Sequence, residues 1–244
     1  MYRQTVPLVI LLLLGSALGA TDPIGVKGVL ASVRAPNHLM VKLEGESLFN
    51  DAMCIAVFMT ILNIIKGGDF SFLIVIETLA FEIVVACVIG YAVGRFALTL
   101  LKGLHDKTTL ILITALLAAG SYLIALYAHA SAPIACVIAG LVVGNKWHEI
   151  ITQDDVDEVN HFWHTIEDII NAFLFTLIGL EIFLIDLNVK MILCGMFAFL
   201  VLHFSRFVAN FFTFSLFPSV WKNSLNGSLT ILSWGGVRGA ISLA

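Results

Sequence analysis

The sequence predicts an all-α, polytopic membrane protein. Hydrophobic residues make up 59% of the chain and charged residues only 12%, whereas soluble proteins carry about 25% charged residues. The mean hydropathy is +1.00, and the apolar residues fall into runs as long as the roughly 20 residues that a helix needs to cross a bilayer. The lipid bilayer is therefore the expected environment, and the net charge of −4 indicates no nucleic-acid partner.

About eight membrane segments are expected, in one transmembrane domain over residues 1–244. Residues 1–20 also resemble a signal peptide, but the apolar segments that follow favour a retained span. The final run is shorter than a full span, so we expect the chain to be part of a longer protein. The approximate bounds of the segments are Val6–Val33, Leu43–Ile65, Phe70–Leu100, Thr108–Tyr127, Pro133–Gly144, Phe162–Leu184, Val189–Phe217 and Leu225–Ala244.

Basic residues gather in alternate loops, those after the first, third, fifth and seventh segments. Because Lys and Arg accumulate on the cytoplasmic side, the first segment should run from outside to inside. Residues 146–161 would then be a cytoplasmic acidic loop with the spacing of a surface helix. That loop is either a solvated helix or, with His161 and His164, a cation-attracting or pH-sensing rim. Its acidic residues are Asp154, Asp155, Asp157 and Glu158.

Two expected segments are interrupted by residues that break a helix. Pro23 lacks an N–H and Asp22 is a good N-cap, so Thr21-Asp22-Pro23 divides the first segment. The break could be a simple capped kink, but an acid at membrane depth favours an ion site. The glycine-rich stretch 233–239 interrupts the last segment. Unwound backbone at membrane depth is tolerated only beside protein or a water-filled cavity. A pair of broken segments is typical of inverted-repeat transporters that bind their substrate at the midplane.

Polar side chains open the second segment, in Glu44-Gly45-Glu46-Ser47-Leu48-Phe49-Asn50-Asp51. On a helix Ser47 and Asp51 share a face, as do Glu46 and Asn50. Glu44 is explained by the helix dipole, but Asp51 lies deeper, where an acid usually has a function. A carboxylate there can hold a proton or, with hydroxyl and amide oxygens, a hard cation. Asp51, Asp22, Thr21, Ser47 and Asn50 are therefore the candidate ion- and proton-binding residues.

Two arginines lie in the apolar segments, Arg206 and Arg238. A buried arginine needs a partner, and Glu46 is the candidate, although Arg206 could instead snorkel to the interface and Arg238 could offset helix C-termini at the break. The remaining acids of the apolar segments have no assigned role; they are Glu77, Glu82, Glu167, Asp168 and Glu181.

Four motifs, in this order, resemble the NhaP/NHE-type sodium/proton antiporters. They are residues 20–23 (ATDP), 44–51 (GESLFND after Glu44), 173–181 (FLFTLIGLE) and 234–240 (WGGVRGA). The resemblance implies an inverted-repeat antiporter fold with two discontinuous crossing helices, of which this chain carries a part. It also implies a homodimer in a bacterial inner membrane that exchanges Na⁺, Li⁺ or K⁺ for H⁺ in pH and sodium homeostasis.

The resemblance further implies roles for particular residues. Asp51 would be the exchanged carboxylate, with Thr21, Asp22 and Ser47 around the Na⁺ ion. Asn50 in place of a second aspartate would go with electroneutral exchange, and Glu46 would pair with an arginine, for which Arg206 is the choice. No cofactor is implied beyond the transported ions.

Two other functions are weighed against exchange. A cation-coupled solute symporter could use the same broken helices. An intramembrane enzyme is disfavoured, because His148-Glu149-Ile150-Ile151-Thr152 has Thr152 where the HExxH motif needs its second histidine.

Overall fold

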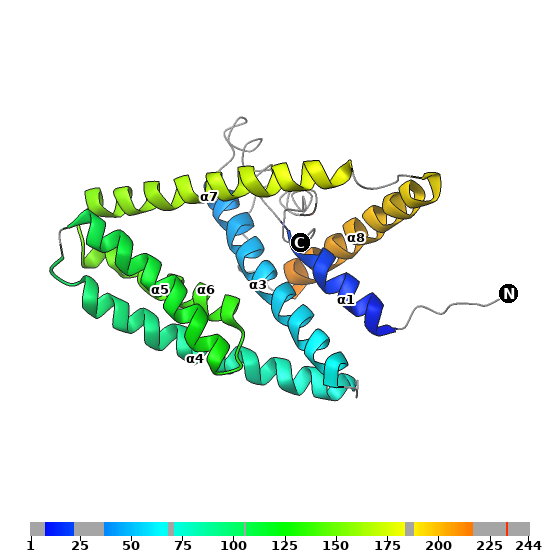
Figure 1. Cartoon of the computed structure of the whole chain (residues 1–244), viewed down its shortest axis with the longest axis horizontal. Helices are drawn as coiled ribbons and strands as arrows, with labels where there is room; N and C mark the ends of the chain where they lie inside the picture. The colour runs from blue at the N-terminus through cyan, green and yellow to red at the C-terminus, as the bar shows by residue number, and fades with distance from the viewer. Residues whose placement is uncertain are drawn as a thin grey trace. The chain divides into compact units, whose positions relative to one another are not determined.

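The computed structural model describes residues 8–21, 37–67, 71–104, 106–183 and 188–216, together with Ser233, and every regular element in these residues is helical (Figure 1). The elements are α1 (Leu8–Gly19), α3 (Asn37–Gly67), α4 (Phe72–Leu101), α5 (Lys107–Tyr127), α6 (Ala132–Gly144), the 3-10 helix η1 (Trp147–Glu149), α7 (Gln153–Ile182) and α8 (Val189–Leu216).

Four of these helices are long and apolar enough to cross a membrane, so the chain is an integral multi-pass membrane protein. The spans are Leu39–Lys66, Phe72–Leu101, Lys107–Tyr127 and Val189–Leu216. The short α6 falls on the expected fifth segment, and α1 on the first half of the expected first segment. Residues 22–33 of the first segment and all of the eighth except Ser233 lie outside the described residues, so the count of eight stays a prediction.

The stretch 146–161, expected as an acidic loop, is helical over most of its length. Residues after η1 enter α7 at Gln153, and this helix continues without a break to Ile182. The acidic residues and the expected sixth segment therefore belong to one helix. Asp154 and Asp155 fall in its first turn, where the helix dipole favours negative charge.

The chain divides into two compact units. Unit 1 comprises Met1–Leu13 and Ala52–Phe173, and unit 2 comprises Leu14–Asp51 and Leu174–Ala244. In unit 1, α4, α5 and α6 lie side by side (Figure 1). Two glycines of α4 face α6 directly: a Cβ at Gly90 would lie 2.5 Å from the Ala135 carbonyl oxygen, and one at Gly94 would lie 2.9 Å from Val142 Cβ. Small residues thus bring the two backbones close enough for dispersion forces to hold them.

In unit 1, a capping residue and an apolar cluster hold the start of α7 against α4 and α5. Asp106 is the N-cap of α5 and accepts the Thr109 N–H at 2.9 Å. Val156 and Val159 of α7 are buried against Leu101 and Leu110. Lys107 Nζ lies 3.0 Å from Glu158 Oε2. These contacts fasten the start of α7 to the ends of α4 and α5.

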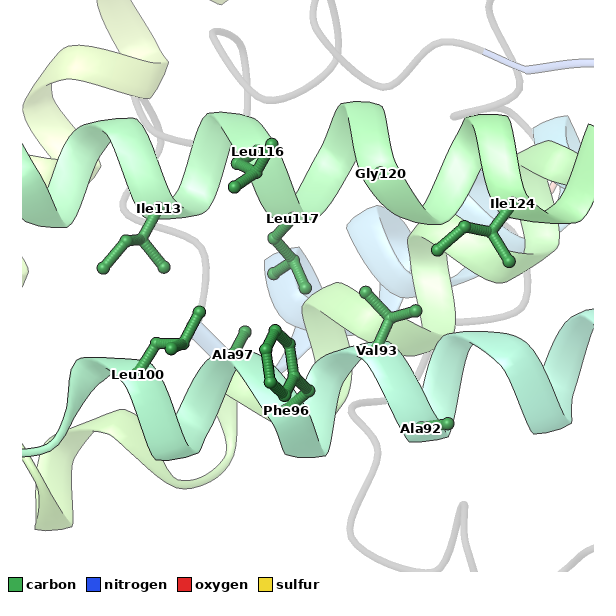
Figure 2. Close-up of a pocket in the computed structure, with 10 residues that line it drawn as sticks. All are labelled: Ala92, Val93, Phe96, Ala97, Leu100, Ile113, Leu116, Leu117, Gly120 and Ile124. Carbon is green, nitrogen blue, oxygen red and sulfur yellow. The ribbon is translucent and has the colours of Figure 1, made fainter.

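A cavity of about 370 Å³ lies between α4 and α5 and is lined only by apolar residues (Figure 2). Figure 2 shows Phe96 and Val93 of α4 opposite Leu117 of α5, with Gly120 leaving part of the α5 face bare. Both helices are membrane spans. Because no lining residue has a polar side chain, this cavity is unsuited to binding an ion.

Candidate functional site

A polar cluster in unit 2 surrounds the place where α1 ends. The helix stops at Gly19, and the next two residues are non-helical and buried, Ala20 with 2% and Thr21 with 5% of its surface exposed. The last carbonyl groups of a helix have no partner within it, so buried residues here need side-chain donors. Those donors come from α3, in the part of the helix that belongs to unit 2.

Ser47 and Asp51 both bind the backbone of Thr21. The Thr21 N–H donates to Asp51 Oδ1 at 3.0 Å, and the Ser47 hydroxyl donates to the Thr21 carbonyl oxygen. The two side chains share one face of α3, as their i and i+4 spacing requires. Together they satisfy both the N–H and the carbonyl group of Thr21, which has left the helix.

Asn50 makes two further contacts through its amide nitrogen. Asn50 Nδ2 donates to the Gly19 carbonyl oxygen at 2.7 Å and to Thr21 Oγ1 at 3.1 Å. Both partners are hydrogen-bond acceptors, so the amide must be oriented with its NH₂ group towards the end of α1. An aspartate at this position would present acceptors to the Gly19 carbonyl. The break therefore selects an amide over a second carboxylate.

Thr21, Ser47, Asn50 and Asp51 form what we call the break site. It brings together one carboxylate, two hydroxyls and backbone carbonyl oxygens, the ligand types that hard cations prefer. Within the described ranges, no three His, Cys, Asp or Glu side chains gather as they would around a resident metal ion. Among its described residues, the break site thus offers one carboxylate beside neutral oxygens.

A charged pair lies next to the break site. Arg206 of α8 reaches Glu46 of α3, with Arg206 Nη2 2.6 Å from Glu46 Oε2. Only 12% of the arginine side chain is exposed, against 33% of the glutamate. Arg206 is therefore not snorkelling to an interface, the alternative raised from the sequence. Glu46 precedes Ser47, so the pair connects α8 to the helix that carries the break site.

Asn210 makes a contact that was not expected from the sequence. It lies one turn after Arg206 on α8, and its Nδ2 donates to Ser233 Oγ at 3.4 Å. Ser233 is buried, and it opens the glycine-rich stretch expected as the second break. A polar residue at i+4 from an intramembrane arginine was the available signal. Two other expected site residues, Asp22 and Arg238, lie outside the described residues.

The chain is similar in sequence to a known family over nearly its whole length. The family model described as "Sodium/hydrogen exchanger, transmembrane" matches residues 2–244. The Na⁺/H⁺ antiporter NhaP of Pseudomonas aeruginosa is 35% identical over 243 residues, which is 96% of this chain and 56% of that protein.

Two further relatives give the same result. NhaG of Bacillus atrophaeus, a Na⁺/H⁺ antiporter, is 31% identical over 239 residues, 93% of this chain and 43% of its own length. NhaH of Halobacillus dabanensis, also a Na⁺/H⁺ antiporter, is 31% identical over 252 residues, 98% of this chain and 59% of its own length. The chain therefore spans about half the length of the curated relatives that it matches.

Proposed function

The chain belongs to the sodium/hydrogen exchanger family of membrane proteins, and on that premise we propose that the protein containing it exchanges Na⁺, or another monovalent cation, for H⁺. The observation that carries the proposal is the contact of Asp51 with the non-helical backbone at Thr21, 3.0 Å between Thr21 N and Asp51 Oδ1. It puts an ionisable group beside unwound backbone within an apolar helix. Such acids mark ion and proton paths.

One carboxylate suffices for coupling, because H⁺ and Na⁺ compete for the same negative charge. Asp51 is neutral both when protonated and when bound to Na⁺, Asn50 adds no charge, and Asp22 keeps the same charge in both loaded forms. Each loaded form can therefore be carried across the bilayer by alternating access to the two sides. The exchange is then one for one and electroneutral.

Thr21, Ser47 and Asp22 supply the other ligands in this proposal. The Ser47 hydroxyl and the Thr21 carbonyl oxygen are hydrogen-bonded to each other, so a cation that takes both oxygens replaces this bond with two ion contacts. Asn50 holds the end of α1 in place throughout, since its amide donors bind the Gly19 carbonyl and Thr21 Oγ1. Asn50 is thus a positioning residue, whereas Asp51 binds the transported ion.

Glu46 and Arg206 have a structural role in the proposal. Their 2.6 Å contact neutralises two charges at membrane depth, where an unpaired charge would cost several kcal/mol. The proposed setting is a homodimer in a bacterial inner membrane, acting in pH and sodium homeostasis.

The test uses the full-length protein in everted membrane vesicles with a respiration-driven pH gradient. Adding Na⁺, Li⁺ or K⁺ should collapse the gradient for the wild type and for Glu77→Gln, a control in the exposed part of α4, but not for Asp51→Asn. Equal exchange by Asp51→Asn at normal expression would refute the role of Asp51. Collapse that depends on an added organic solute would instead indicate symport, for which the relatives' names give no support.

A further inference from the structure

A second polar contact lies in unit 1, away from the break site. Thr60 of α3 is buried, with 1% of its surface exposed. Its Oγ1 is 2.8 Å from the Ala56 carbonyl oxygen and 2.8 Å from Glu82 Oε2 of α4. Glu82 falls within the span Phe72–Leu101, about 15 Å along the axis from Phe72. The carboxyl group is therefore at membrane depth.

The surroundings of this contact are apolar. Ala52 and Ala56 of α3 pack in one cluster with Ala86 of α4 and the start of α6. The Ser131 N–H donates to the Glu82 carbonyl oxygen at 3.4 Å, and the buried Ser131 hydroxyl has no partner among the described residues. An unpartnered buried hydroxyl is commonly satisfied by a water molecule.

No cation among the described residues pairs with Glu82. None of the ionisable side chains on the elements packed around it bonds to its carboxyl group, and Lys66 stands about 9 Å along the α3 axis from Thr60. An ionised carboxylate left without a cation at this depth is costly. The other ionisable residues with described side chains on α3, α4, α5, α6 and the α5–α6 turn are Lys42, Glu44, Glu46, Asp51, Cys54, Lys66, Glu77, Cys87, Tyr91, Arg95, Lys107, Tyr122, Tyr127, His129 and Cys136.

The number of hydrogens available to the two contacts supports a protonated Glu82. A threonine hydroxyl has one hydrogen to donate, while the Ala56 carbonyl and an ionised Glu82 are both acceptors. One of the two 2.8 Å contacts would then join two oxygens without a hydrogen between them. If Glu82 carries a proton, its O–H donates to Thr60 Oγ1 and the Thr60 O–H donates to Ala56, so both contacts are satisfied.

We propose that Glu82 and Thr60 form a second proton-binding site in the spanning part of this chain, with the proton on Glu82 in the conformation described. On release, the Oε2–H bond breaks and the proton passes to water. The Thr60 hydrogen then turns to the carboxylate, and the Ala56 contact is lost. The site is separate from the break site, although Thr60 and Asp51 share α3. It does not depend on the proposed exchange function.

The test is infrared spectroscopy of the full-length protein in phospholipid liposomes, in H₂O and D₂O, in the carbonyl-stretching region of protonated carboxylic acids. Wild type and Glu77→Gln, a matched change on the exposed face of α4, should show a carboxylic acid band that Glu82→Gln lacks. Glu82→Gln is expected to fold, because the Gln amide can donate to Thr60 as the protonated acid does.

Variants of Thr60 test the pairing with Glu82 independently of Glu82→Gln. In Thr60→Val the shape is kept but the hydroxyl is removed, so the Glu82 band should remain and shift in frequency, while Thr60→Ser should leave it in place. Coincident spectra for wild type and Glu82→Gln would overturn the proton on Glu82. An unshifted band in Thr60→Val would overturn the pairing with Thr60.

Discussion

The α4–α6 pair of unit 1 and the break site of unit 2 are both buried in a chain of the same apolar composition, yet they are held together differently. Gly90 and Gly94 let α4 approach the backbone of α6 without any side-chain hydrogen bond at those positions. At the break site, hydrogen bonds from Thr21, Ser47 and Asn50 replace a missing helical turn. The first contact depends on shape and the second on donors and acceptors.

This difference has a physical reason. Helices that satisfy their own backbone need only close packing to associate in lipid. A chain that leaves the helix at membrane depth must find partners for each freed N–H and C=O. Polar side chains at such a place are therefore not interchangeable, whereas packing positions tolerate any residue of the right volume. Four predictions test this contrast.

The largest expected effect is the loss of Arg206. In Arg206→Met the Glu46 carboxylate loses its 2.6 Å partner, and removing one partner of a buried pair costs about 3–5 kcal/mol. Because Glu46 is one-third exposed, we expect the lower end, about 3 kcal/mol. Thermal unfolding of the purified full-length protein would measure it. Glu46→Gln combined with Arg206→Met should regain part of the loss, and a double variant no better than the single one would contradict the pairing.

Gly90→Ala should destabilise unit 1 through packing alone. The new Cβ would meet the Ala135 carbonyl oxygen at 2.5 Å, so the helices must separate, at a cost of about 2 kcal/mol. Gly120→Ala is the matched control, because a Cβ there meets nothing within 4 Å. It should be neutral or slightly stabilising. Equal melting temperatures for the two variants would show that α4 and α6 do not pack this closely.

Asn50→Asp should disturb the break site more than Asn50→Ala does. The carboxylate would face the Gly19 carbonyl oxygen, 2.7 Å from the present amide nitrogen, and two acceptors repel. We expect a loss of about 1–2 kcal/mol in stability and a fall in exchange rate, measured by thermal melting and by vesicle assays. If Asn50→Asp melts no lower than Asn50→Ala, the amide orientation assigned here is wrong.

The smallest effect concerns the exposed cap of α5. Hydrogen bonds from the Thr109 side chain and then from its backbone N–H hold the pKa of Asp106 below its ordinary value of 3.8. A lowered pKa means that the ionised form stabilises the fold above pH 3.8, and that this contribution is lost as the pH falls through the folded-state value. Asp106→Ala should lower the melting temperature slightly at neutral pH but not in strong acid. Asp106→Asn can still cap the helix, so its melting temperature should lie between those of the wild type and Asp106→Ala. A melting-temperature difference between wild type and Asp106→Ala that does not change with pH would contradict the lowered pKa of Asp106.

Much of the break site was predictable from residue types alone. Asp22-Pro23 after a small-residue run predicted the end of the first half-helix, and α1 does end at Gly19. The i and i+4 positions of Ser47 and Asp51 predicted a shared polar face. Asn210 was not predicted: its i+4 spacing from Arg206 indicates only a shared face of α8, and its partner Ser233 lies on another segment.

Hydropathy and helix breaking are local properties, so the membrane class, the family and the polar residues that interrupt the apolar runs can be read from the residues alone. The partners of these residues are visible only in the folded chain: Asp51 with the Thr21 N–H, 30 residues apart, and Arg206 with Glu46, 160 residues apart. The folded chain also separates Gly90, which has no room for a side chain, from Gly120, which does. Such pairings depend on how close two backbones come, and no spacing along one helix contains that distance.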